Sequence, residues 1–275
     1  MNLRPLALLS LLLLALSVSA AAPATQPREI RLIARADDMG AAQSINEGCI
    51  EAYKEGIVRS VEVVVPGPWF LDAVRLLKEN PDLDVGVHLT LTCEWDRIKW
   101  RPLTRAPSLV DVDGYLLPST RDWSGQPDLG EVEMELRAQI EAAKRHLGDR
   151  VTHVSARAGA AVSTPDLKKL TEELAKEYGL RVGDAVKTAG NFGDNSFSND
   201  QREKSLMKFL ERLQPGDWLL AERPAYDTPE LRGFGHAGYE NVASDRANVR
   251  RALTSERVQA VVRKRGIKLI GYGDL

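Results

Sequence analysis

The fold is decided by Arg31-Leu-Ile-Ala-Arg-Ala-Asp-Asp-Met-Gly40, an apolar run that ends in two adjacent carboxylates, Asp37 and Asp38. Short apolar runs bounded by turn residues are typical of buried strands in α/β proteins, and ligand chemistry gathers at the carboxyl ends of such strands. Because side chains alternate along a strand, we expect only one of the two aspartates to face a site squarely. This stretch alone fits equally well a polar turn that caps the following helix.

The composition favours one globular domain with a small ligand. The chain has 275 residues, of which 43% are hydrophobic and 28% are charged, so it can bury a large core. Its formal net charge is -2, and the two signs are interspersed. We therefore expect no nucleic-acid partner and no polybasic membrane patch, and a neutral or mildly charged small molecule is the favoured ligand.

Residues 1–22 have the layout of a secretory signal, with a basic residue, an apolar segment and small residues in that order. We expect export to the periplasm or the extracellular space, with residues 23–29 as a flexible leader. The apolar segment is too short for a stable membrane span. Export permits a disulfide between Cys49 and Cys93, but a buried helix position for Cys49 and a loop position for Cys93 are equally good interpretations.

Strand and helix patterns alternate from Ile30 to the end of the chain at roughly thirty-residue spacing, which is the pattern of a parallel sheet with right-handed crossovers. The sequence thus predicts a single α/β domain over residues 30–275, an irregular TIM-like (β/α) barrel with about seven βα units. Strands are expected at 31–38, 57–65, 83–88, 151–156, 180–182, 217–221 and 267–270. Helices are expected at 43–55, between Pro68 and Asn80, and at 131–147, 165–178, 204–213 and 249–265, the last with a break near Thr254-Ser255.

The periodicity disappears over residues 89–130, where Trp95, Trp100, Tyr115 and Trp123 stand among proline, arginine, aspartate and glycine. A loop of this length inside a compact domain is usually functional. Exposed tryptophans in it could stack on sugar rings. The alternative is that the aromatic residues pack the loop onto the barrel.

Asp37, Asp38 and His88 lie at the ends of the first and third predicted strands. Carboxylates combined with an imidazole suit a divalent metal, and a third ligand would let such a metal activate water. Two further strand ends, near residues 154–157 and near Glu222-Arg223, are expected to complete the site.

Short motifs spread over residues 30–275 carry a family resemblance. They are Ala36-Asp-Asp-Met-Gly40, Asn46-Glu-Gly48, Gly86-Val-His-Leu-Thr-Leu-Thr92, Glu135-Leu-Arg-Ala-Gln139, Thr152-His153, Pro224-Ala-Tyr-Asp-Thr-Pro-Glu230 and Gly266-Ile-Lys-Leu-Ile-Gly-Tyr272. In this order they resemble the YdjC-like (ChbG/HpnK) carbohydrate deacetylases. The resemblance implies an irregular TIM-like barrel, a divalent metal such as Mg or Zn, and hydrolytic removal of acetyl groups from N-acetylated amino sugars.

The resemblance also implies roles for individual residues. It places the metal on Asp38, on His88 and on a histidine at the position of Arg157, with Asp37 as the candidate base for metal-bound water. A late histidine, at the position of Arg223, would assist as an acid or an electrostatic partner.

This chain departs from the family pattern where the chemistry is expected. Arg157 and Arg223 replace the two histidines, and Ser155 and Ala156 replace an aspartate and a serine. Arginine is permanently charged and offers only donors, so it cannot ligate a cation. Arg157 could point away from the site or pair with one of the aspartates, and either arrangement weakens metal binding.

Two functions remain open from the sequence. The first is a deacetylase with weak or lost catalysis, in which a metal stays on the remaining ligands and water, His153 or His236 supplies what is missing. His153 is more simply a core histidine. The second is a pseudoenzyme that binds anionic or amino sugars in the same cleft. In that case Arg157, Arg223 and His236 form the ligand-binding set, because guanidinium groups pair with carboxylate, sulfate or phosphate.

A phosphoesterase on the same barrel has only the Asp-Asp pair in its favour. The sequence does not identify the sugar or the oligomeric state, for which a dimer is one option.

Overall fold

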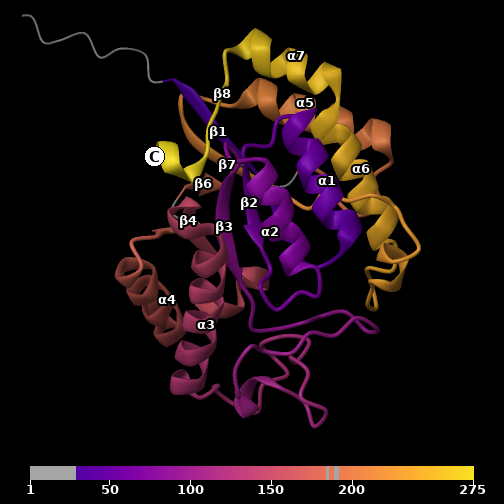
Figure 1. Ribbon diagram of the computed structural model, residues 1–275. Coiled ribbons are helices and arrows are strands. Elements are labelled where there is room, and N and C mark those ends of the chain that lie inside the picture. The colour runs from indigo at the N-terminus through magenta and orange to yellow at the C-terminus, as the bar shows by residue number, and fades with distance from the viewer. Residues whose placement is uncertain (1–28, 184–185, 189–191) are drawn as a thin grey trace, which may run out of the picture.

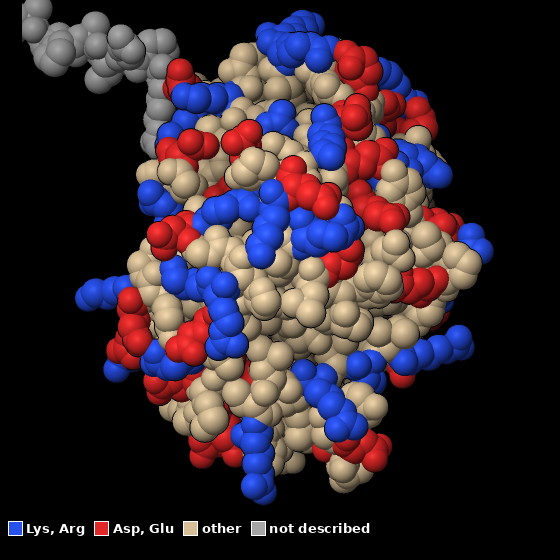
Figure 2. Space-filling model, viewed as in Figure 1, with Lys and Arg blue, Asp and Glu red and all other residues tan. Residues whose placement is uncertain are grey.

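The computed structural model describes residues 29–183, 186–188 and 192–275. The signal expected at residues 1–22, and the leader apart from Glu29, lie outside the described residues. Within them, no helix combines the length and the apolar character that a membrane crossing needs. On the face drawn in Figure 2, basic and acidic side chains are interspersed, as expected from the sequence.

One parallel sheet forms the centre of the protein, and the helices pack around the outside of its curve (Figure 1). The strand order is β5-β4-β3-β2-β1-β7-β6, and β8 pairs with β1. The opening stretch of the sequence is therefore the central strand, which pairs with β2, β7 and β8. The strands are β1 (Ile30–Met39), β2 (Ser60–Val63), β3 (Asp84–Leu89), β4 (Val151–Ala156), β5 (Arg181–Val182), β6 (Lys187–Thr188), β7 (Gly216–Glu222) and β8 (Lys268–Leu269).

The α/β class, the parallel sheet and the barrel-like curvature are confirmed. The edge strands β5 and β6 are not paired with each other in the described part of the chain. Closure into a complete TIM-like barrel therefore stays a prediction.

Seven helices occur in the described residues, and most agree with the sequence patterns. They are α1 (Gln43–Lys54), α2 (Phe70–Glu79), α3 (Leu129–Leu147), α4 (Pro165–Glu177), α5 (Asn199–Arg212), α6 (Val242–Thr254) and α7 (Glu256–Arg265). The predicted break between α6 and α7 is confirmed, and Ser255 caps α7 by accepting backbone N–H groups. Helix α5 begins earlier than expected because Ser198 and Gln201 form a reciprocal capping box. The two-residue strand β6 was missed, since it is too short for periodicity to reveal.

The long loop after β3 is packed against the barrel. Trp95, Trp100 and Trp123 are only 2%, 3% and 7% exposed. The idea that exposed tryptophans of this loop stack on sugars is therefore wrong for these three residues. The alternative, in which aromatic side chains fix the loop to the domain, is confirmed, because the three tryptophan side chains are buried.

Helix α3 holds this loop through two fully buried polar side chains. The Glu135 carboxylate accepts hydrogen bonds from the backbone N–H groups of Leu103 and Thr104. Gln139 exchanges two hydrogen bonds with the backbone of Thr90, just beyond β3. A long loop carries many amide groups that need partners, and these side chains supply them.

Both cysteines are buried free thiols. The helix position expected for Cys49 and the loop position expected for Cys93 are confirmed. The Sγ atom of Cys49 lies 4.0 Å from the backbone oxygen of Asp37, and burial raises the pKa of this thiol.

Candidate functional site

The end of β1 brings Asp37 and Asp38 to the same site. The expected alternation fails because Asp38 adopts a left-handed backbone conformation with φ 69°, and the register to β2 shifts between Ala36 and Met39. His88 Nε2 consequently lies 3.8 Å from Asp38 Oδ1 and 4.0 Å from Asp37 Oδ2. Both carboxylates are buried, with 1% exposure each.

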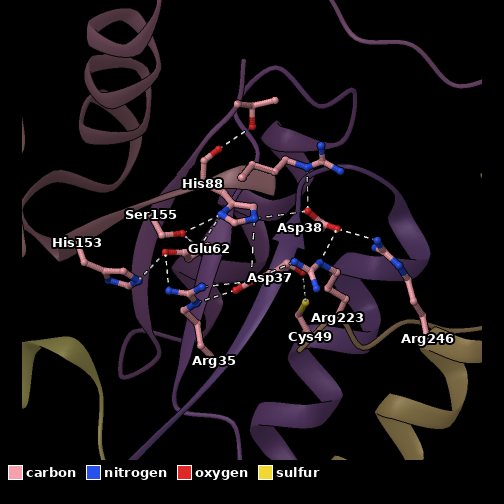
Figure 3. A network of polar contacts seen from close by, with 12 residues as sticks. Arg35, Asp37, Asp38, Cys49, Glu62, His88, His153, Ser155, Arg223 and Arg246 are labelled. Carbon is pink, nitrogen blue, oxygen red and sulfur yellow. Dashed lines mark hydrogen bonds and ion pairs between the residues drawn. The ribbon is translucent and has the colours of Figure 1, made fainter. Parts of the chain in front are cut away.

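His88 is oriented by Glu62, which is fully buried on β2 (Figure 3). The His88 Nδ1 atom lies 2.7 Å from Glu62 Oε2, so this nitrogen carries the hydrogen and donates it to the carboxylate. Ser155 on β4 donates to the same carboxylate and lies beside Nδ1. The other ring nitrogen, Nε2, points toward the two aspartates and has no hydrogen-bond partner among the described side chains.

Arg157 occupies the position at which the family resemblance implies a metal ligand. Its Nε donates to Asp38 Oδ1 at 3.1 Å, and its two terminal nitrogens donate to the Glu94 carboxylate at 2.7 Å each. The guanidinium also lies 4.7 Å from the ring centre of Trp100. Arg157 is 3% exposed, so it points into the site and pairs with a predicted metal ligand.

Arg35 and Arg246 also belong to the network in Figure 3. Arg35 donates to both oxygens of Asp37, at 2.7 and 3.2 Å, and lies 3.2 Å from Glu62 Oε1. Arg246 on α6 donates to Asp38 Oδ2 at 2.8 Å. Burial alone would raise the pKa of Asp38, but the neighbouring arginines outweigh burial and hold that pKa well below its usual range.

Four residues of this network escaped the sequence analysis. Arg35 and Glu62 had detectable signals, because Arg35 shares a strand face with Asp37 and Glu62 interrupts a valine-rich strand. Glu94 and Arg246 had none, since a loop and a late helix bring them to the site.

The charges of the network balance without a metal. Its carboxylates are Asp37, Asp38, Glu62 and Glu94, and its guanidinium groups are Arg35, Arg157, Arg223 and Arg246. Four negative groups thus face four positive groups. A divalent cation would add two charges to a cluster in which each carboxylate already has a guanidinium partner, which is energetically costly.

Asp37, Glu62 and His88 are close enough to hold a metal, with ligand atoms within 4.8 Å of one another. Arg35, however, bonds Asp37 and also pairs with Glu62. The set expected from the family is likewise blocked, because Arg157 and Arg246 bond Asp38. The donor groups therefore do not fit a divalent metal in the arrangement that the structure shows.

The remaining predicted site residues lie at the rim. The Arg223 side chain is 45% exposed, and its nearest contacts are Asp38 at 3.6 Å and Asp37 at 4.0 Å. His236 is half-buried, donates from Nδ1 to the backbone oxygen of Ala237 in its own loop, and has its ring centre 5.9 Å from that of Trp95. His236 thus packs on the long loop rather than on the aspartates.

His153 is fully buried and stacks on Tyr272, with ring centres 3.7 Å apart. Its Nε2 atom lies 3.3 Å from Glu62 Oε1. The interpretation of His153 as a core histidine is confirmed.

A cavity of about 590 Å³ adjoins Arg223 at the carboxyl ends of β6 and β7. Glu222, Asn195 and Tyr239 contribute to its lining. Burial raises the pKa of Glu222 to about 7, although Arg223 and Arg202 counteract the rise.

The pKa of Glu222 predicts a pH dependence of stability. A carboxyl pKa raised in the folded state gives stability that is present at low pH and is lost as the pH rises from about 4.5 through 7. We expect the wild-type protein to lose up to about 3 kcal/mol of unfolding free energy over this window from this group. Denaturant unfolding between pH 5 and pH 8 should show a flatter profile for Glu222→Gln. An unchanged profile in that variant would contradict the prediction.

Carboxylates and a histidine at the carboxyl ends of a curled parallel sheet define a barrel-like α/β protein with a polar site where such folds usually bind ligands. A family model described as YdjC-like protein matches residues 31–264, so the chain belongs to the YdjC-like family. It is 27% identical to a carbohydrate deacetylase of Thermoanaerobacter pseudethanolicus over 89% of this chain and 98% of that protein. It is 29% identical to a carbohydrate deacetylase of Geobacillus stearothermophilus, covering 88% and 96% of the two chains.

A solved structure is similar to this chain over most of its length. The crystal structure of a putative cellobiose-phosphate cleavage protein from Enterococcus faecalis superposes with a TM-score of 0.75 at 26% identity. The match covers 90% of this chain and 98% of that one. The resemblance stated from the motifs is confirmed.

Proposed function

We propose that this protein is a carbohydrate-binding member of the YdjC-like family in which metal-dependent deacetylation is lost. The observation that carries the proposal is the buried bridge that Arg157 makes between Asp38 and Glu94. This bridge places the permanently charged guanidinium of Arg157 against Asp38, the aspartate that a metal would need as a ligand. A carbohydrate ligand follows from the family and from the curated relatives, which are named carbohydrate deacetylases.

Burial supports the same conclusion. Asp37, Asp38, His88 and Arg157 are each at most 3% exposed. Hydrolysis requires the acetyl group of the substrate to reach the catalytic base and the metal-bound water. Because these four side chains are buried, a substrate has little access to them. Arg223, by contrast, is open to solvent beside a cavity. Burial thus favours ligand binding at the rim over hydrolysis at the aspartates.

Weak hydrolysis is the second candidate, and one observation favours it. His88 keeps the orientation of a metal-binding histidine, with Nδ1 hydrogen-bonded to a carboxylate and Nε2 directed at Asp37 and Asp38. Arg157 would have to move away from Asp38 before His88 Nε2 and Asp38 could bind a metal together.

One experiment separates the two candidates. Metal content and acetate release are measured for the purified protein with N-acetylated chito-oligosaccharides, before and after addition of Zn, Mg, Mn or Co. We expect no stoichiometric metal, no acetate and no rise in melting temperature with any of these ions, since only a ligand of the folded state stabilises it. Stoichiometric metal together with acetate release would overturn the proposed loss of catalysis.

Export is also part of the proposal. It rests on the order of basic, apolar and small residues in segment 1–22. The amino-terminal sequence of the mature protein tests it, and an intact residue 1 would contradict it.

A further inference from the structure

The cavity beside Arg223 has the size and lining of a small-ligand site. Its volume of about 590 Å³ lies within the range of pockets that hold small molecules. Thr188, Asn195 and Tyr239 bring hydroxyl and amide groups to the wall. Such groups are suited to sugar hydroxyls, which both donate and accept hydrogen bonds.

Two acidic side chains of the wall, Asp194 and Asp245, are already engaged. Asp245 accepts hydrogen bonds from Arg202 and, at 2.6 Å, from the Tyr239 hydroxyl. Asp194 accepts a hydrogen bond at 2.8 Å from the backbone N–H of Ser196 in its own turn. Asp194 and Asp245 therefore have partners within the protein.

Arg223 is the exposed arginine of this wall, whereas Arg202 is buried and paired with Asp245. Its two ion pairs, at 3.6 and 4.0 Å, are too long for hydrogen bonds. Asp37 and Asp38 already accept shorter hydrogen bonds from Arg35, Arg157 and Arg246. The aspartates thus have closer partners, and the half-exposed Arg223 guanidinium keeps donors that can meet a ligand in the cavity.

We propose that this cavity binds a sugar with an anionic substituent, and that Arg223 is the residue that binds the anion. The inference rests on the proposed carbohydrate-binding function. A guanidinium pairs with a carboxylate, sulfate or phosphate through two parallel hydrogen bonds, which gives both charge and geometric selectivity. Arg157 takes no part in this recognition, because Glu94 and Asp38 occupy its donors.

Calorimetric titration of the full chain tests the inference with six probes: D-glucuronic acid, glucose 6-sulfate, glucose 6-phosphate, glucose, glucosamine and sodium sulfate. We expect at least one acidic sugar to bind about tenfold or more tightly than glucose, with an advantage that falls as salt is added. The Arg223→Gln variant should lose the preference for acidic sugars. The Arg223→Lys variant should keep part of that preference, because lysine retains the positive charge but cannot form two parallel hydrogen bonds to the anion. Arg263→Gln is the matched control, since Arg263 is exposed on α7 and pairs only with Glu256 among the described residues.

The outcomes are distinct. Equal binding of glucose and of all acidic sugars, or an unchanged preference in Arg223→Gln, would overturn the inference and leave neutral sugar binding standing. Sodium sulfate that binds as tightly as the acidic sugars would also overturn it, because the site would then select an anion without a sugar. Binding of none of the sugars would overturn both this inference and the proposed carbohydrate binding. Acetate release, assayed on the same samples, decides the loss of catalysis separately.

Discussion

Arg157→Ala is expected to lower the free energy of unfolding by about 3–5 kcal/mol, the range found when one partner of a buried ion pair is removed. The variant loses three short hydrogen bonds, two to Glu94 and one to Asp38. It also leaves the Glu94 carboxylate in a largely buried position without its cation. Burial by itself would raise the pKa of Glu94, and Arg157 is the main group that lowers it. Urea unfolding at neutral pH measures the effect.

Two comparisons make this result specific. Arg263→Ala removes an exposed ion pair with side chains 60% and 75% accessible, so it should cost less than about 1 kcal/mol. Arg157→Ala combined with Glu94→Gln should cost less than the sum of the two single changes, because the second change removes the unpaired charge. A loss below about 1 kcal/mol in Arg157→Ala would show that the bridge does not hold the site together.

Metal binding is expected to appear when the arginines that block the ligands are replaced. In Arg157→His with Arg223→His, Asp38 loses two of its three guanidinium neighbours and keeps Arg246, and the site gains two histidine side chains. The 3.8 Å between His88 Nε2 and Asp38 Oδ1 is compatible with two ligands of one ion at about 2.0–2.2 Å each. Zinc at a hundred times its dissociation constant should then add about 2.7 kcal/mol to the unfolding free energy.

Arg35 is expected to be a second obstacle. It bonds Asp37 through two nitrogens and pairs with Glu62, so a site that uses Asp37 stays closed while Arg35 is charged. Adding Arg35→Gln to the double variant should increase zinc affinity further and permit acetate release. Melting temperatures with zinc and with a chelator, for wild type, double and triple variants, rank the three proteins. Equal responses of wild type and triple variant would contradict the assignment of these arginines as the block.

The sequence placed some of the site residues together correctly and others not. Asp37, Asp38, His88 and Arg157 were placed together from strand ends and family motifs, and the structure brings all four within one network. His236 was grouped with them, yet it packs on Trp95. The strand alternation expected for the two aspartates failed because the backbone of Asp38 turns to positive φ, a local conformation that the side-chain pattern does not encode.

The sequence by itself determined the parallel α/β fold, the family and the loss of the expected histidines, because hydrophobic periodicity and ordered motifs are local along the chain. Only the tertiary structure decided what the arginines do. Arg157 meets Glu94 and Asp38, whereas Arg223 stays open at a cavity. Charge pairing depends on distances between side chains from strands, loops and helices far apart in sequence, and folding alone sets those distances.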